Sequence, residues 1–395
     1  MAPHKGPRRM TMPDATALIL GGGAAGLQLG AALAEAGVNA AIIEPRHDYV
    51  SDRTWSFWAE PDHPFADCEL GRWSRWSVAH GDHYVARQSE TLVYISLDAG
   101  RVYDRLTSII DQSDCVTLHR GISAYGTPER RDGPGRWQVM TDQGPLTARY
   151  VFDSRPPLQT RPVYGQYFLG HEIKTNSPCF NPKTAQLMHF RPHPDGTGVD
   201  FLYTLPFSDC HALIEVTRFT AIPPDEDQMA DWLAREVQNI LGDTEATLIR
   251  AEAGFLPMRV TSPPDTTNTP GYLPIGLAGG AARASTGYAF NRMGLAARAL
   301  AGQVADDHPN PAIDLDGAMS RWMDRVFLSV IERNPTHAPG LFTQLFQNVP
   351  TDRLERFLEG SKQASDRLAI MRALPIAPFL KAAMIPPATS TERAA

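Results

Sequence analysis

A glycine-rich turn between an apolar segment and a helical segment constrains the fold of this chain more than any other feature. Residues 15–20 (ATALIL) are apolar, residues 21–26 read GGGAAG, and residues 27–36 have helical character before Gly37. A second apolar segment, residues 39–44, follows directly. Strand, turn, helix and strand within about thirty residues predict the βαβ unit of a parallel sheet.

Three glycines of this turn, Gly21, Gly23 and Gly26, fit the pattern G-x-G-x-x-G that is typical of dinucleotide binding. The first glycine permits a tight turn, the second lets the backbone approach a pyrophosphate, and the third lets the helix pack closely on the strand. The N-terminus of the helix, with Ala24 and Ala25 in its first turn, would then face the anion.

The strand after this helix ends at Glu44, where a carboxylate can bond ribose hydroxyls. Because FAD enzymes commonly carry this unit at the start of the chain, its position favours FAD over NAD(P). A glycine-rich turn in an unrelated α/β domain is the alternative interpretation.

The composition narrows the class of protein. A length of 395 residues exceeds one ordinary domain of about 100–200 residues, which predicts two domains or one elaborated α/β domain. A net charge of −7, without a Lys/Arg-rich block, argues against nucleic-acid binding. Four separated cysteines and twelve histidines without ligand spacing predict neither a disulfide framework nor a metal site. No apolar stretch is long enough to be a transmembrane helix.

The sequence pattern changes at about residue 162. Residues 186–190, 200–206 and 212–219 alternate between apolar and polar side chains, which predicts an antiparallel sheet. Residues 228–241 have the pattern of an amphipathic helix, and the chain after Pro311 is helical in character.

These patterns predict an α/β (α+β) fold in which a Rossmann-type FAD-binding domain carries an inserted antiparallel-sheet substrate domain and a C-terminal helical region. The expected division is 14–65, 100–160 and 255–305 for the FAD-binding domain, 66–99 and 161–254 for the substrate domain, 306–384 for the helical region, and disordered tails at 1–13 and 385–395.

Segments spread over nearly the whole chain after residue 14 match one family in order and at family spacing. Besides the glycine loop they are 53–56 (RTWS), 164–166 (YGQ), 171–172 (HE), 201–207 (FLYTLPF), 213–218 (LIEVTR), 254–257 (GFLP), Gly276, 286–288 (TGY) and 354–360 (LERFLEG). On these segments the chain resembles the bacterial flavin-dependent lycopene beta-cyclases, which have a flavin hydroxylase-like architecture. One departure is Val216, where relatives often carry a second acidic residue, so Glu215 is expected to lack an acidic neighbour.

The resemblance implies acid-catalysed ring closure. Lycopene is an acyclic hydrocarbon, so a proton must be delivered to C2 of its terminal double bond, which leaves a tertiary cation at C1. The C5–C6 double bond attacks this cation, and a proton leaves C6. Substrate and product are isomers, so there is no net redox change. The protein must supply a strong, dry acid, a cation-tolerant surface and an apolar tunnel.

Glu215 is the predicted acid. Alternation along a strand places Leu213, Glu215 and Thr217 on one face, and Ile214, Val216 and Arg218 on the other. A carboxyl group on an inward face would be desolvated, and its raised pKa would keep it protonated near neutral pH. An exposed edge-strand glutamate, paired with Arg218, is the alternative.

Further residues are expected around the flavin and the substrate. The resemblance implies reduced FAD, with NADPH as the electron source. The expected flavin contacts, besides the loop and Glu44, are Arg53, Asp153, Gly279, Gly280, Gly287 and Tyr288. The expected substrate or cation contacts are Trp55, Tyr203, Phe207, Thr217, Arg218 and Phe290. For each aromatic residue alone, core packing is the alternative, and for Asp153 it is a plain strand-ending turn.

The sequence leaves other functions open. An FAD-dependent hydroxylase or isoprenoid-chain reductase is the second hypothesis, and a non-enzymatic flavoprotein or carotenoid carrier is the third. The family resemblance implies lycopene and related acyclic carotenoids as partners, and a cytoplasmic protein peripherally associated with the lipid surface of the inner membrane. The number of ends cyclised, the carotenoid range, the ring type and the oligomeric state are left open.

Overall fold

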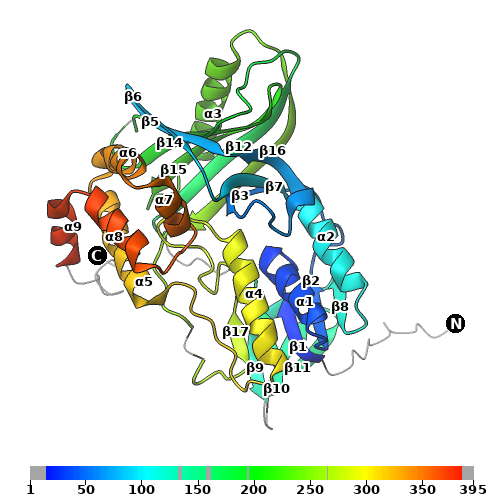
Figure 1. The fold of residues 1–395 in the computed structure, drawn as a ribbon. Helices are drawn as coiled ribbons and strands as arrows, with labels where there is room; N and C mark the ends of the chain where they lie inside the picture. The colour runs from blue at the N-terminus through cyan, green and yellow to red at the C-terminus, as the bar shows by residue number, and fades with distance from the viewer. Residues whose placement is uncertain (1–14, 132–135, 157–161, 194, 265, 385–395) are drawn as a thin grey trace.

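The computed structural model describes residues 15–131, 136–156, 162–193, 195–264 and 266–384 (Figure 1). The tails predicted to be disordered, 1–13 and 385–395, lie outside the described residues. None of the helices within these ranges is long and apolar enough to cross a membrane.

The first sheet is built on the predicted βαβ unit. Its strands run in the order β8-β2-β1-β11-β10-β9, and β17 pairs with β11. Pairs among β8, β2, β1, β11 and β17 are parallel, whereas β10 and β9 form an antiparallel edge. The strands are β1 (Ala15–Leu20), β2 (Ala40–Glu44), β8 (Val116–Arg120), β9 (Ala124–Arg131), β10 (Arg136–Thr141), β11 (Gly144–Asp153) and β17 (Tyr272–Pro274).

Three helices accompany this sheet, namely α1 (Ala24–Glu35), α2 (Ala99–Asp111) and α4 (Phe290–Ala305) (Figure 1). Their apolar faces meet the sheet in a core where Ile19, Leu27 and Ile42 are fully buried. Burial on both sides explains why β1 and β2 are continuous apolar runs rather than alternating patterns.

The second sheet confirms the antiparallel region predicted after residue 162. Its order is β16-β12-β15-β14-β13-β5-β6, and all neighbours are antiparallel except β13 and β5. The strands are β5 (Arg75–His80), β6 (His83–Gln88), β12 (Gly165–Thr175), β13 (Ala185–Arg191), β14 (Val199–Ser208), β15 (His211–Thr220) and β16 (Ala246–Pro257). One face is covered by α3 (Glu226–Leu241), where Trp232 and Leu233 pack on Ile214 and Val216.

A third, three-stranded sheet joins segments that the sequence division had separated. It consists of β3 (Thr54–Ala59), β7 (Val93–Asp98) and β4 (Glu69–Trp73), in the order β3-β7-β4. The expected boundary between residues 65 and 66 therefore lies between strands of one sheet, and our division of the chain into domains stays a proposal.

The predicted C-terminal helices pack beside the second sheet (Figure 1). They are α5 (Gly317–Arg333), α6 (Ala338–Asn348), α7 (Thr351–Leu358), α8 (Ala364–Ala373) and α9 (Ile376–Ala383), with short 3-10 turns at Ala66–Cys68 and Pro335–His337. Phe342 of α6 contacts Phe190 and Phe219 of the sheet, with ring centroids 5.7 and 6.4 Å apart. Trp76 of β5 donates to Glu355 of α7 at 2.7 Å. The helices thus share one core with the sheet.

Gly26→Ala should destabilise the fold, because an added Cβ would lie 1.9 Å from the carbonyl oxygen of Gly21. We expect the free energy of unfolding to fall by about 1–3 kcal/mol, as for other overpacked sites. Gly302→Ala in α4 is the matched control: its Cβ would meet no atom within 4 Å, and alanine should stabilise that helix by roughly 0.5–1 kcal/mol. Urea unfolding of both variants measures the difference, and equal effects would contradict this account.

Candidate active site

The glycine loop is held in place by contacts from two other strand ends. Gly21 has a φ of +92°, which favours glycine. The Ser154 hydroxyl donates to the carbonyls of Leu20 and Gly21 at 2.8 and 2.9 Å. The backbone N–H of Gly22 donates to Glu44 Oε2 at 2.6 Å. The loop is therefore fixed to the carboxyl ends of β11 and β2 at the edge where dinucleotides bind to such sheets.

Glu44, at the end of β2 as predicted, is ionised and paired. Its Oε1 accepts from the Arg46 side chain at 2.8 Å. Burial raises the pKa of Glu44, but hydrogen bonds and charge from Arg46 and the Gly22 N–H outweigh this, so the pKa lies below its usual value. Arg46 and Tyr49 also bind the carbonyl of Gly22, at 3.2 and 2.8 Å.

A cavity of about 610 Å³ runs from this loop to the second sheet. It brings together residues of β2, β3, β7, β12, β14, β15 and β16, of α1 and α2, and of the start of α4. The predicted site residues that line it are Gly21, Gly23, Ala24, Ala25, Glu44, Arg53, Trp55, Tyr203, Glu215, Gly287, Tyr288 and Phe290.

The other predicted site residues do not line this cavity, each for a visible reason. Gly26 packs against the loop from inside α1. Asp153 is paired with Arg155 at 2.7 Å. Phe207 lies against Trp73, with ring centroids 6.1 Å apart. Thr217 is fully buried and donates its hydroxyl to Glu215. Gly279 and Gly280 form a turn beyond β17, where a Cβ on Gly279 would meet the carbonyl of Pro274 at 2.4 Å.

Arg218 lies on the opposite face of β15, as the alternation predicted. Its guanidinium forms a bidentate ion pair with Asp200, at 2.8 and 2.7 Å, and lies over the Trp232 ring of α3. Arg218 is thus neither a partner of Glu215 nor a group that the structure brings to the cavity.

Glu215 is a buried carboxyl group facing the cavity. Burial raises its pKa well above the usual value, the charge of Glu252 raises it further, and a hydrogen bond from the Thr217 hydroxyl at 3.1 Å opposes this in part. Burial and the Glu252 charge both favour the protonated form of the carboxyl group, which is the state that a general acid requires.

Glu252 corrects our expectation that Glu215 has no acidic neighbour. Position 216, where relatives often carry an acid, points to the α3 face, and Val216 is fully buried there. The carboxyl neighbour comes instead from β16: Glu252 lies across Gly170 from Glu215 at the wall of the same cavity, and its charge raises the pKa of Glu215. Burial raises the pKa of Glu252 as well, although Arg250 and Thr54 oppose the shift.

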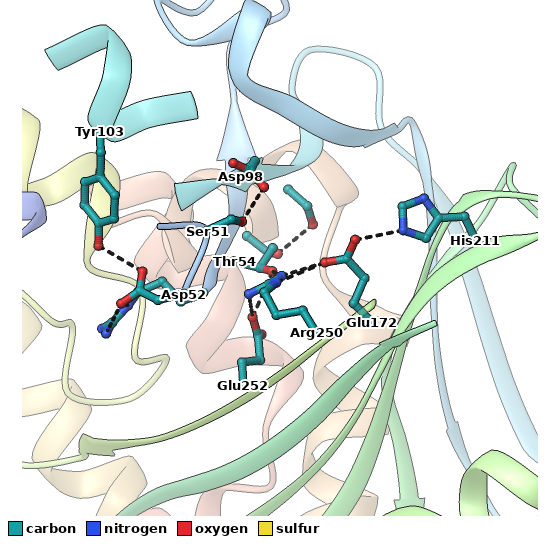
Figure 2. Close-up of polar contacts among 12 residues, drawn as sticks. Ser51, Asp52, Thr54, Asp98, Tyr103, Glu172, His211, Arg250 and Glu252 are labelled. Carbon is teal, nitrogen blue, oxygen red and sulfur yellow. Dashed lines mark hydrogen bonds and ion pairs between the residues drawn. The ribbon is translucent and has the colours of Figure 1, made fainter. Parts of the chain in front are cut away.

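Glu252 belongs to a polar network that runs through Arg250 and Glu172 to His211, shown in Figure 2. Its Oε2 accepts from Arg250 at 2.5 Å and from the Thr54 hydroxyl at 3.0 Å. Arg250 also donates to Glu172 at 2.9 Å, and Glu172 binds His211 at 2.8 Å. Burial raises the pKa of Glu172, but His211 and Arg250 bring it below the usual value. One partly buried arginine thus pairs with two buried carboxylates beside the cavity.

A second, apolar cavity of about 230 Å³ lies between the second sheet and the C-terminal helices. It shares Tyr203, Thr286 and Tyr288 with the first cavity, so the two meet at these residues. Burial raises the pKa of both tyrosines well above 10, which keeps their hydroxyls neutral. At the other end, its lining includes exposed apolar side chains of α5, α8 and α9, namely Trp322, Met371, Ile376 and Leu380.

The sequence profile of the lycopene cyclase protein family matches residues 17–384, which is nearly the whole chain. This chain belongs to the lycopene cyclase family. The recognition made from the sequence segments is therefore confirmed.

Curated lycopene beta-cyclases are similar to this member of the family at modest identity. The one from a Paracoccus species is 28% identical over 59% of this chain and 63% of that protein. The one from Pantoea ananas is 26% identical over 68% of this chain and 74% of that protein. The match thus spans just under two thirds of the Paracoccus protein.

Solved structures confirm the fold class. A geranylgeranyl bacteriochlorophyll reductase-like protein from Thermoplasma acidophilum matches with a TM-score of 0.60 at 11% identity, over 94% of this chain and 98% of that chain. Aklavinone-11 hydroxylase, solved with FAD and aklavinone, matches with a TM-score of 0.55 at 14% identity. The match covers 83% of this chain and 71% of that chain. At such identities the likeness shows the fold alone, the Rossmann-type architecture of flavin-dependent enzymes.

From the sequence we did not single out Thr54, Tyr94 and Glu252, which line the larger cavity, or Arg250, which binds Glu252. Thr54 lies within the segment RTWS that carried the resemblance. Glu252 lies two residues before the segment GFLP, and strand alternation places both Glu252 and Gly254 on one face. That spacing was the available signal for Glu252. It does not reveal which strand pairs with β16, and so it could not place Glu252 beside Glu215.

Arg250→Met should destabilise the protein at neutral pH, because it leaves Glu172 and Glu252 buried without their cation. We expect a loss of about 3–5 kcal/mol. Without Arg250 the pKa values of both carboxyl groups rise, so they take up protons as the pH falls and the loss should shrink. Urea unfolding at neutral and mildly acidic pH measures this.

The matched control for this prediction is Arg105→Met, which removes an exposed ion pair with Asp67. It should change the free energy of unfolding by no more than about 1 kcal/mol, since exposed pairs contribute little. A pH-independent loss in the Arg250 variant would mean that packing, rather than charge, is what this arginine provides.

Proposed function

We propose that this chain is a lycopene beta-cyclase, an isomerase that closes the acyclic ends of lycopene to beta-rings through gamma-carotene to beta-carotene. The observation that carries the proposal is the position of Glu215, a buried carboxyl group in the cavity that reaches the glycine loop and meets the apolar cavity at Tyr203 and Tyr288. An apolar chain that enters past the C-terminal helices would present its end to this acid. Family membership supports the same activity.

FAD fits the larger cavity. Gly23 has ordinary extended backbone angles, with φ −76° and ψ −169°, and a Cβ there would meet no atom within 4 Å. The space beside the loop is therefore open to a pyrophosphate at the start of α1. We propose that the loop, Glu44 and Arg53 hold the adenosine diphosphate half, and that Gly287 and Tyr288 border the flavin ring.

When bound and reduced, with NADPH as the electron donor, FAD would supply an electron-rich group that stabilises positive charge. The chain's own residues would do the proton chemistry. Glu215 would hold a proton and deliver it to C2 of the terminal double bond. Trp55 and Phe290, stacked 4.7 Å apart at the cavity wall, together with Tyr203 and Tyr288, would exclude water and tolerate the cation.

Membrane contact is part of the proposal, because lycopene resides in lipid. The mouth of the apolar cavity exposes Ile376 and Leu380, whose side chains are 72% and 57% accessible. Helices with apolar residues facing outward in this way can lie in a bilayer surface. We propose a cytoplasmic protein whose α8 and α9 rest on the inner membrane and receive lycopene or related acyclic carotenoids there.

An isoprenoid-chain reductase is the second candidate function. It is favoured by the fold likeness to the geranylgeranyl bacteriochlorophyll reductase-like protein. A reductase would consume NADPH in proportion to product and would change the product mass, whereas a cyclase would do neither.

Gly23→Val should abolish flavin retention while leaving the fold intact, because the added side chain fills the space beside the loop and strains no backbone. Gly302→Val on the exposed side of α4 is the control and should retain flavin. The flavin absorbance of the purified proteins measures this, together with thermal unfolding. A Gly23→Val protein that purifies with full flavin would remove the basis for this site.

Glu215→Gln should fold and bind flavin but lose cyclisation by about 10²- to 10⁴-fold, the usual contribution of a positioned general acid. Glu215→Asp should retain a trace of activity, since its carboxyl group is withdrawn by one methylene. The assay supplies lycopene in liposomes to enzyme whose flavin was reduced beforehand, without oxygen and without a further electron donor. It measures the mass and the absorption spectrum of the product.

In the same assay Glu129→Gln, an exposed substitution on β9, should cyclise at the wild-type rate. Near wild-type cyclisation by Glu215→Gln would place the acid elsewhere. Stoichiometric transfer of hydride from labelled NADPH into the product would instead support the reductase.

A further inference from the structure

Two glutamates meet on the cavity face of the second sheet. The strand register pairs Tyr203 with Glu215, Glu215 with Gly170, and Gly170 with Glu252. Side chains of directly paired residues point to the same side of a sheet. Because Gly170 has no side chain, the side chains of Glu215 and Glu252 face each other across it at the wall of one cavity. Two ionised carboxylates in this position would repel each other, and neither could donate a hydrogen bond to the other, so the arrangement favours one proton held between them.

The surroundings of the two groups are unequal. Glu252 accepts from the Arg250 guanidinium at 2.5 Å and from the Thr54 hydroxyl at 3.0 Å. Glu215 accepts from the neutral hydroxyl of Thr217 at 3.1 Å, and no ion pair to it occurs within the described ranges. The negative charge is therefore more stable on Glu252, and the proton is more stable on Glu215.

We propose that Glu215 and Glu252 act as one proton-sharing pair, in which Glu252 is a positioning residue that keeps the proton on Glu215. This inference rests on the proposed cyclisation and adds to it a residue that acts through the acid. The Glu252 carboxylate, anchored by Arg250, keeps the proton on Glu215 at neutral pH and aligns the Glu215 carboxyl group at the cavity wall.

The pair gives up one proton and takes one back during the reaction. Glu215 gives its proton to C2, which breaks its O–H bond and forms the new C–H bond, and the cation at C1 then lies beside two carboxylates. After the ring closes, the proton that leaves C6 returns to the pair. C2 and C6 are both bonded to C1 in the ring, so one pair can serve both positions. The pair begins and ends with one proton, and no electrons are exchanged.

Other groups also face the pair and have to be accounted for in a pH profile. Tyr203 of β14 and Tyr94 of β7 lie beside Glu215, and burial raises the pKa of both. Glu172 of β12 and Arg250 of β16 lie beside Glu252. The charge of Glu359 acts on Tyr94 and Tyr288, and burial raises the pKa of Glu359 to about 7. Glu359 is therefore the group whose titration could be mistaken for that of the pair.

The test is an infrared titration of the carboxyl stretch in the flavin-loaded protein without substrate. The wild type should show the pair losing its shared proton in an upper step, separate from the step in which both groups are protonated. Glu252→Gln removes the like charge beside Glu215, so its single step should lie at lower pH than the wild-type upper step, by roughly one unit or more. Glu252→Asp, which keeps the charge, should restore much of the pH difference between the two titration steps of the pair.

The pH profile of cyclisation provides the second measurement. Glu215 must be protonated, so activity is present below its raised pKa and is lost as the pH rises through it. In Glu252→Gln this alkaline loss should move to lower pH by the same interval as the infrared step. Glu359→Gln is the matched control in the infrared titration: it should remove its own band and leave the upper step of the pair in place.

An upper step that stays in place in a folded Glu252→Gln protein would overturn the pair, and so would an unmoved alkaline loss of activity. If wild-type protein shows the predicted infrared steps but does not cyclise lycopene, the proposed function fails while the proton-sharing pair stands. If Glu252→Gln does not fold, Glu252→Asp carries the test, and an upper step that disappears in this charged variant would likewise contradict the proposal.

Discussion

A carboxyl group buried without a cation of its own is the constraint on which the rest of this site depends. Glu215 is buried in its sheet beside Tyr203 and has no ion pair within the described residues, while the Arg250 guanidinium is paired with Glu172 and Glu252. A cation placed against Glu215 would favour its ionised form. The separation of the charged network from the acid is therefore as important as the burial itself.

The two cavities differ in character because different elements build them. The larger is lined by the glycine loop and charged side chains at strand ends, whereas the smaller is lined mainly by apolar residues of the C-terminal helices. Their common boundary, formed by Tyr203, Thr286 and Tyr288, lies beside the acid. The fold thus brings a polar cofactor-type site and an apolar channel to one point without mixing their surfaces.

Local patterns predicted the parts of this structure that depend on neighbours in the sequence. The βαβ unit at Gly21–Gly26 and the inward face of Glu215 follow from turn chemistry and strand alternation. Glu252 was missed because its position opposite Gly170 is a matter of register among β15, β12 and β16, which are far apart in the chain. Asp153 and Gly279 were placed at the site by position alone, and the pairing with Arg155 and the turn after β17 were not visible from the sequence.

The meeting of the two cavities at a single acid also bears on how a long, symmetrical molecule is handled. In the proposed function, the end that passes Tyr203 and Tyr288 would reach Glu215, while the remainder of the molecule would stay in the apolar cavity or outside it. For the proposed substrate, the two ends are then treated in separate visits: a half-reacted molecule has to withdraw, reverse its direction and enter again. With the membrane contact proposed above, that reversal would take place in the lipid outside the cavity, and the membrane would then set how often the second end follows the first.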